Sequence, residues 1–461
     1  MAVGAAPGLI APPAPSEDRC FARRYADGLL RDLGRQTTPA PPREHPAVRA
    51  AISGLHWLTG AADTPAQVCP VPLAAAADGT LAALRSLPGG AALDGIDGAA
   101  LLTERAALLG LHRQGDRSAA GACRLLTCRD GMLAVHLARD SDWALLPAWL
   151  EREAVTDWGH LEQHLRGSLQ APLLERARWL GLPVTAVGPP RRYAPWMQPD
   201  ARLAMAPATV PDRRPRVVDL SSLWAGPLCS HLLQRMGAEV IKVETRQRPD
   251  GARQGHPAFF DRLHAGKASV ALALETAEGR SQLLTLLREA DIVIEAARPR
   301  GLRQLGIHAE ALLAERPGLT WIAITGYGRE GDNAERVAFG DDAAMAAGLG
   351  WIMAEAYGRA CFVGDALADP LTGLHAALAA WEGWLRGGGG LRALALRDVV
   401  GHVITSAGVD TPWRARAQQW QRALQARGLM PQPPVWHDPP GSAAALGADN
   451  ARLLPPRAMP C

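Results

Sequence analysis

Lysine is nearly absent from this chain: its 461 residues include 49 basic side chains, of which only Lys242 and Lys267 are lysines. The formal net charge is only +3, so a dedicated nucleic-acid-binding surface is not expected. No apolar run reaches the roughly 18 residues of a transmembrane helix. Residues 1–20 lack the basic segment that begins a signal peptide. These absences together predict a cytoplasmic protein with no nucleic-acid or membrane partner.

The seven cysteines are scattered and form no C-x-x-C pair. A disulfide framework or a zinc site is therefore not expected. Cys123 and Cys128, with His112 and His136, could be proposed as metal ligands, but their unrelated spacing favours a structural role. No metal site is predicted.

Proline-rich segments and changes of rhythm divide the chain into four parts. Residues 1–47 form a predicted Pro-rich N-terminal arm with one amphipathic helix, and residues 401–461 form a C-terminal helix and a Pro-rich tail. Residues 48–210 alternate predicted helices with a β-hairpin about Asp130-Gly131 and a later short strand. This pattern predicts a small α+β module.

Residues 211–400 alternate apolar strands with segments of helix length. Strands are predicted at 215–222, 238–244, 291–296 and 319–326. The order predicts an α/β fold with a doubly wound, parallel, Rossmann-like sheet, preceded by the smaller module. The sequence GYGREG matches G-x-G-x-x-G, but it follows the fourth strand and no clear helix opens after it. A nicotinamide-dependent dehydrogenase is thus a poor fit.

Asp369 and Pro370 come directly before a long apolar helix predicted over 370–386. Local physics favours Asp369 as the N-cap of this helix. The same position stabilises an ionised carboxylate, which can attack an activated acyl carbon. Asp341 and Asp342 could serve as acid or base near Asp369, although solvated loop aspartates are the simpler interpretation.

Residues 217–400 resemble the class III CoA-transferase family, the formyl-CoA and carnitine CoA-transferase type. The matching segments are VVDLSSLWAGP, MGAEVIKVE, AGKASVALAL, ADIVIEAARPRGLRQLGI, ITGYGREG and DPLTGLH, in the family's order and spacing. The module 48–210 resembles the family's small domain, placed ahead of the sheet instead of after it. A rearranged chain and a fusion to a degenerate second copy explain this order equally well.

The resemblance implies an acyl-CoA:carboxylate CoA-transferase in which Asp369 is the catalytic nucleophile and passes through an aspartyl-CoA thioester. It implies no permanently bound cofactor, with coenzyme A or acyl-CoA as substrate, a small carboxylic acid as acceptor, and a homodimer. The family's coenzyme A contacts and acyl-site aromatic fall on nine positions here: Ser222, Trp224, Ala225, Thr245, Lys267, Ala296, Ala297, Arg303 and Tyr327.

Departures from the family leave alternatives open. Thr245, Ala296 and Ala297 stand where some members have polar groups that bind coenzyme A. One alternative is a non-catalytic or degenerate paralogue that binds coenzyme A weakly or acts as a partner subunit. Another is an acyl-CoA lyase or hydratase without a covalent intermediate. The family's racemase branch has a histidine in the segment matching 337–342, and its absence here argues against proton transfer at an α-carbon.

Overall fold

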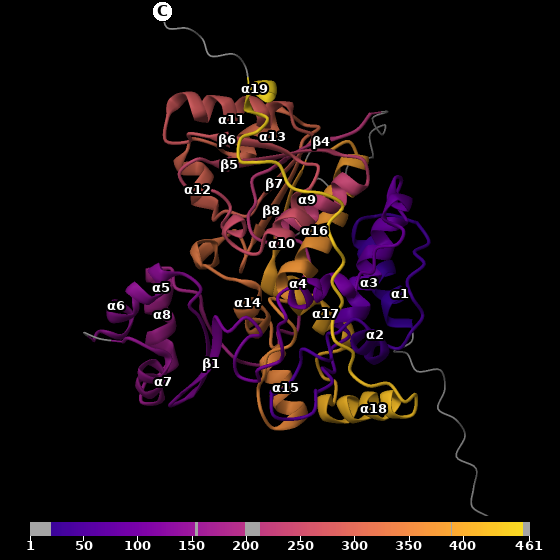
Figure 1. Cartoon of the computed structure of the whole chain (residues 1–461), viewed down its shortest axis with the longest axis vertical. Helices are drawn as coiled ribbons and strands as arrows, with labels where there is room; N and C mark the ends of the chain where they lie inside the picture. Colours follow the sequence, from indigo (N-terminus) through magenta and orange to yellow (C-terminus); the bar gives the residue numbers. More distant parts are fainter. Residues whose placement is uncertain (1–19, 153–154, 199–212, 389, 455–461) are drawn as a thin grey trace, which may run out of the picture.

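The computed structural model describes residues 20–152, 155–198, 213–388 and 390–454 (Figure 1). The first 19 residues of the predicted arm and the last seven of the predicted tail lie outside the described residues. Within the described part of the chain, no helix combines the length and the apolarity that crossing a membrane requires.

A six-stranded parallel sheet forms the centre of the larger part of the molecule, which confirms the predicted α/β fold. Its strand order is β6-β5-β4-β7-β8-β9, and every neighbouring pair is parallel. The strands are β4 (Arg216–Asp219), β5 (Glu239–Thr245), β6 (Ala268–Leu272), β7 (Ile292–Glu295), β8 (Thr320–Thr325) and β9 (Gly390–Ala395). The chain leaves β4 in one direction and returns to β7 on its other side, so the order reverses between β4 and β7. Such a switch point is where open α/β sheets bind ligands.

Helices cover both faces of this sheet because successive strand residues point to opposite sides. Val217 belongs to the core shared with α9 and α16, whereas Val218 belongs to a second core shared with α11 and α13. Thr276 starts α11 by accepting the Gly279 N–H at 3.0 Å. The helices of this part are α9 (Ala225–Arg235), α10 (Pro257–His264), α11 (Ala277–Glu289), α12 (Pro299–Gln304), α13 (Ala309–Glu315), α14 (Gly340–Ala346), α15 (Leu349–Tyr357), α16 (Ala368–Leu385) and α17 (Leu396–Ala407).

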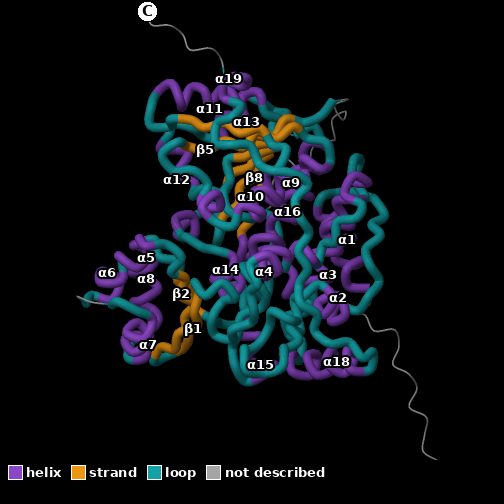
Figure 2. The backbone as a smooth tube through the Cα atoms, in the orientation of Figure 1, coloured by secondary structure: helices purple, strands orange, loops and turns teal. Residues whose placement is uncertain are grey.

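The N-terminal half adds a helical layer and a separate small sheet (Figure 2). The predicted hairpin is present, with Cys128 opposite Gly131, and a third strand pairs with it. A third core lies between this sheet and its helices. The elements are α1 (Phe21–Asp32), α2 (Pro46–Ile52), α3 (Leu73–Arg85), α4 (Glu104–Leu108), β1 (Cys123–Cys128), β2 (Gly131–His136), α5 (Asp140–Ala144), α6 (Leu146–Leu150), α7 (Trp158–Arg166), α8 (Gln170–Leu180) and β3 (Val184–Ala186).

The helix predicted in the N-terminal arm does not project from the molecule. Tyr25 and Leu29 of α1 are buried in the main core, and α1 packs along α3. The Tyr25 hydroxyl and a ring nitrogen of His375, on α16, are 2.8 Å apart. Helix α1 is therefore part of the support for α16.

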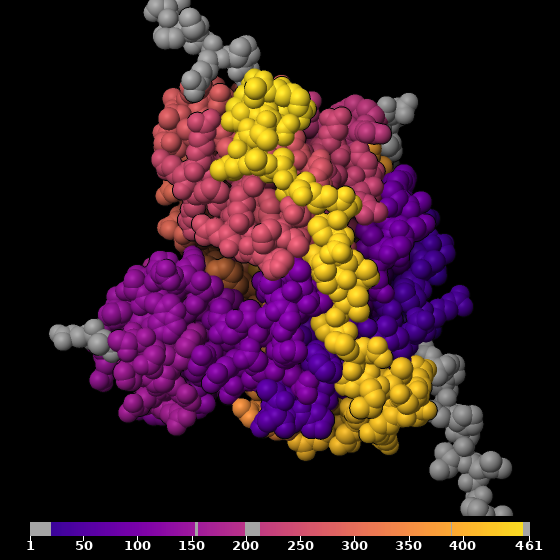
Figure 3. Space-filling model, viewed as in Figure 1, coloured from indigo at the N-terminus to yellow at the C-terminus, as the bar shows by residue number. Residues whose placement is uncertain are grey.

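The C-terminal segment crosses the surface from α18 (Trp413–Gln425) to α19 (Asn450–Leu453), as the yellow strip in Figure 3 shows. At its far end Asn450 bonds both the N–H and the carbonyl of Ala271, each at 2.9 Å. The Asp449 carboxylate accepts the Ser269 N–H at 2.8 Å. This segment therefore covers β6, the edge strand of the sheet.

Candidate active site

Asp369 lies in the first turn of α16, one residue after the helix begins. The N-cap is Leu367, which makes no side-chain cap, so the prediction that Asp369 is the N-cap is wrong. Asp369 uses its backbone N–H in a bond to the Ala366 carbonyl at 2.9 Å. Its carboxylate accepts the backbone N–H of Gly340, and the residue as a whole is half-buried. The Asp369 side chain therefore does not cap the helix to which it belongs.

The turn that leads to Asp369 is held from three directions. Asp365 receives two hydrogen bonds from the Arg105 guanidinium, at 2.8 and 2.6 Å. The Ala366 N–H donates to Asp341 at 2.8 Å. A side chain at Gly340 would come closer than 3.0 Å to both the Ala366 carbonyl oxygen and Asp369 Oδ2, so only glycine fits there. These contacts fix the direction of the Asp369 carboxylate.

Backbone strain is concentrated beside Asp369. Ala366 has a φ of 42° and Leu223 a φ of 70°, in the region that side chains with a Cβ rarely adopt. Leu223 lies in the turn between β4 and α9, at the switch point of the sheet. In the described residues only Glu151, at the end of α6, shares this backbone region among non-glycine residues. Residues with strained backbones often cluster at functional sites. Two of the three, Ala366 and Leu223, lie in the turns that precede α16 and α9, so these turns are candidates for a functional site.

Asp341 and Asp342 are buried at the start of α14, which corrects their interpretation as solvated loop residues. Asp342 accepts the Tyr327 hydroxyl at 2.9 Å and the Phe339 N–H at 2.7 Å. His136 Nδ1, from β2, lies 3.5 Å from the other side of this carboxylate. The Asp342 carboxylate therefore links the end of β8 to the N-terminal module.

Burial and neighbouring charges change the protonation of Asp369 and Asp341. Burial raises the pKa of Asp369 to about 7, a shift that Arg105 opposes and the neighbouring Asp341 reinforces. Burial likewise raises the pKa of Asp341 to about 6. The pKa of His136 is raised because its contact with Asp342 outweighs the cost of burial. A carboxylate of this kind is ionised above neutral pH and poorly hydrated, and both properties favour nucleophilic attack.

The predicted coenzyme A contacts fall into two groups. Ser222, Ala296 and Ala297 are exposed on the loops after β4 and β7, beside the switch point. Thr245, at the end of β5, is partly exposed, and Arg303 of α12 is exposed and 3.5 Å from Glu310. Because the strands are parallel, the loops that follow them all lie at the carboxyl end of the sheet.

The other predicted contacts are buried. Lys267 donates from Nζ to the Pro227 carbonyl at 3.0 Å and to Ser230 Oγ at 2.7 Å, so its ammonium group supports α9 from inside. Tyr327 and Ala225 are also buried. Trp224 is buried, and its indole Nε1 has no hydrogen-bond partner in the described structure. Among these four buried residues, only Trp224 therefore has a side-chain polar atom without a hydrogen-bond partner.

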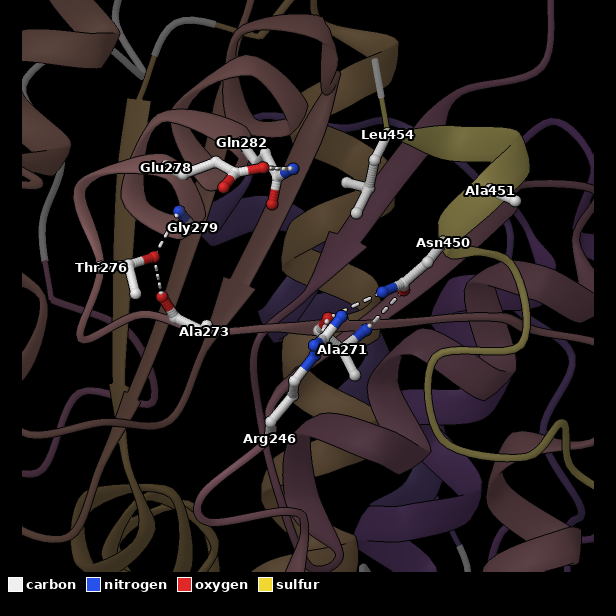
Figure 4. A pocket seen from close by; sticks show the side chains of 10 residues that line it. All are labelled: Arg246, Ala271, Ala273, Thr276, Glu278, Gly279, Gln282, Asn450, Ala451 and Leu454. Carbon is white, nitrogen blue, oxygen red and sulfur yellow. Dashed lines mark hydrogen bonds between the residues drawn. The ribbon is translucent and has the colours of Figure 1, made fainter. Parts of the chain in front are cut away.

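Two cavities at this carboxyl end of the sheet are lined by arginines. One, of about 240 Å³, lies between the small module and α12 and includes Arg139, Arg298 and Arg300 in its lining. The other, of about 260 Å³, lies at the ends of β5 and β6, where Arg246 and Asn450 line it (Figure 4). Among the residues that the structure describes, no cluster of three or more metal-ligating side chains occurs.

Sequence reasoning missed Arg105, Asp365 and the role of His136. Arg105 and Asp365 are 260 residues apart, and no spacing or motif links them. His136 was considered only as a metal ligand or a structural histidine. His136 reaches this cluster because α14 packs on β2 and β3 of the small module.

The fold and this cluster define an α/β protein with several buried carboxylates beside the switch point of its sheet. Residues 215–388 match the family model of CoA-transferase family III. This match confirms the resemblance over that segment, which is less than half of the chain.

Curated relatives also match only a part of this chain. A succinate–glutarate CoA-transferase of Agrobacterium fabrum is 32% identical over 184 residues, covering 36% of this chain and 46% of that protein. A probable fatty acyl-CoA transferase of Mycobacterium tuberculosis is 38% identical over 132 residues, covering 26% and 33%. The chain thus spans less than half the length of these two relatives. A CaiB/BaiF family protein from Brucella suis gives a TM-score of 0.38 at 31% identity, over 49% of this chain and 60% of that one.

Proposed function

We propose that this protein is an acyl-CoA:carboxylate CoA-transferase with Asp369 as its nucleophile. The observation that carries the proposal is the placement of Asp369: the residue is half-buried, its carboxylate does not cap its own helix, and a strained turn leads to it. The family III segment supports the same reaction class.

The reaction needs no redox partner. A carboxylate oxygen of Asp369 attacks the thioester carbon of the acyl-CoA, the carbon–sulfur bond breaks, and coenzyme A leaves as the thiolate. The thiolate then attacks the aspartyl carbonyl of the mixed anhydride, which releases the free acid and leaves an aspartyl-CoA thioester. The acceptor carboxylate repeats both steps in reverse order. The Gly340 N–H, which bonds to the Asp369 carboxylate, would stabilise the oxyanion that forms when the thiolate attacks the aspartyl carbonyl.

For coenzyme A we propose the exposed loops at the switch point, where Ser222, Ala296 and Ala297 lie, with Thr245 and Arg303 at its sides. The contacts at 296 and 297 would then come from the backbone, because alanine has no polar side-chain atom. Trp224 and Tyr327 would shape the inner end of the site. Lys267 and Ala225 would act only through the scaffold, since both are buried.

The decisive experiment is mass spectrometry of the protein after incubation with an acyl-CoA. We expect a covalent coenzyme A adduct on Asp369, absent in Asp369→Ala and retained in Asp63→Ala, which changes an exposed aspartate outside the site. An adduct that survives Asp369→Ala would remove Asp369 from the role.

A second candidate is a degenerate paralogue, because Ala296 and Ala297 offer no side-chain contacts. Calorimetry with coenzyme A alone separates the two: no heat of binding favours the paralogue. A lyase or hydratase would turn over an acyl-CoA with no acceptor acid present.

The homodimer and the cytoplasmic location also remain proposals. Light scattering after size-exclusion chromatography tests the first, and fractionation of cells that express the protein tests the second.

A further inference from the structure

Arg105 enters the site from outside the family segment. It lies on the short helix α4, whereas the matching segment begins only at residue 215. Its guanidinium binds both oxygens of Asp365, whose side chain is completely buried. Such a two-bond contact fixes orientation as well as position. Asp365 is four residues before Asp369, so Arg105 holds the start of the strained turn.

The Arg105 guanidinium also makes a cation–π contact. Arg105 lies over the ring of Trp224, with its Cζ 5.0 Å from the ring centroid. Trp224 directly precedes α9, at the turn where Leu223 is strained. Gly373, one helical turn after Asp369, packs against the Ala225 carbonyl of the same turn. One cation therefore connects the two strained turns of the site.

Arg105 is the principal positive charge that acts on Asp369. The groups that face this region are predominantly acidic and come from every element packed there. They are Asp341 and Asp342 on α14, Asp365 in the turn, Tyr327 after β8, Cys123 on β1 and His136 on β2. Like charges at such distances disfavour ionisation, and an arginine counters them at any physiological pH.

We propose that Arg105 is a positioning residue for Asp369: its two-bond contact with Asp365 orients the carboxylate, and its charge favours the ionised form of that carboxylate. The inference rests on the proposed function for its catalytic meaning. It also makes residues 20–152 a necessary part of the site, because the family segment alone lacks this cation.

Two substitutions with opposite electrostatic signs test the proposal. Arg105→Gln removes the positive charge, so the pH midpoint of kcat/KM rises by about one unit or more. Asp365→Asn removes a negative charge and leaves Arg105 in place, so the midpoint falls. Arg105→Lys keeps the charge but loses the two-bond grip, so kcat falls while the midpoint stays near that of the wild type. Arg262→Gln is the matched control: it breaks the 3.2 Å contact with Glu104, next to Arg105, and leaves the midpoint unchanged.

A second readout does not depend on turnover. The pH dependence of unfolding free energy is compared for each variant with and without Asp369→Asn, and the difference reports the ionisation of Asp369 itself. Midpoints that move in the same direction in Arg105→Gln and Asp365→Asn, or do not move in Arg105→Gln, overturn the inference. A wild-type protein that forms no coenzyme A adduct overturns the proposed function instead, and the unfolding data still decide on Arg105.

Discussion

Gly340→Ala tests whether the close packing around Asp369 is as tight as the structure shows. The new methyl group would come closer than 3.0 Å to the Ala366 carbonyl oxygen and to Asp369 Oδ2. Backbone cannot yield as a flexible side chain does, so we expect a loss of about 1–3 kcal/mol in the free energy of unfolding. The carboxylate must also move. A displacement of about 1 Å at a reacting group can lower the rate by about a hundredfold.

The assay combines urea unfolding with the rate of coenzyme A transfer between an acyl-CoA and a free acid. Gly28→Ala on α1 is the matched control, because a Cβ there meets no atom within 4 Å. That substitution should stabilise the protein by about 0.5–1 kcal/mol through helix propensity and leave transfer unchanged. A Gly340→Ala protein with wild-type stability and wild-type transfer would refute the packing argument.

Two further predictions follow from the same structure. Because burial raises the pKa of Asp369 to about 7, its ionisation costs stability as the pH rises from about 4 to about 7. Asp369→Asn should therefore be more stable than the wild type at pH 8, by about 1–3 kcal/mol given the partial exposure, and equal to it near pH 4, as urea unfolding at the two pH values would show. Trp149→Ala should lower the free energy of unfolding by about 3–5 kcal/mol, because Trp149 is fully buried and its Nε1 donates to the Leu173 carbonyl at 2.8 Å. Thermal or urea unfolding measures this loss. A loss smaller than about 1 kcal/mol would contradict the burial of Trp149 in the third core.

The sequence was most informative where the local pattern decides the structure. Short segments rich in Val and Ile identify β4, β5, β7 and β8, because the strands of a parallel sheet are buried on both faces. The Asp130-Gly131 turn identifies the hairpin. Strand β6 was missed, since Ala268–Leu272 is rich in alanine and follows a polar segment. Strand β9 and helix α17 form one apolar stretch, whose division no single period reveals.

The site was less predictable than the fold. Resemblance alone singled out Asp369, since its local sequence favours a helix cap. Asp341 and Asp342 seemed solvated because nothing in their neighbourhood shows that α14 is covered by β2 and β3. Arg105 could not be found at all, because its partner is 260 residues away and charge pairing leaves no periodic trace.

The cover over β6 has a consequence for how the protein is made. The Asp449 carboxylate accepts the Ser269 N–H across 180 residues of chain, so the outer strand acquires these partners only after the residues between them have been synthesised. Until then the nascent sheet presents unpaired main-chain groups to neighbouring chains, a state that invites association during translation.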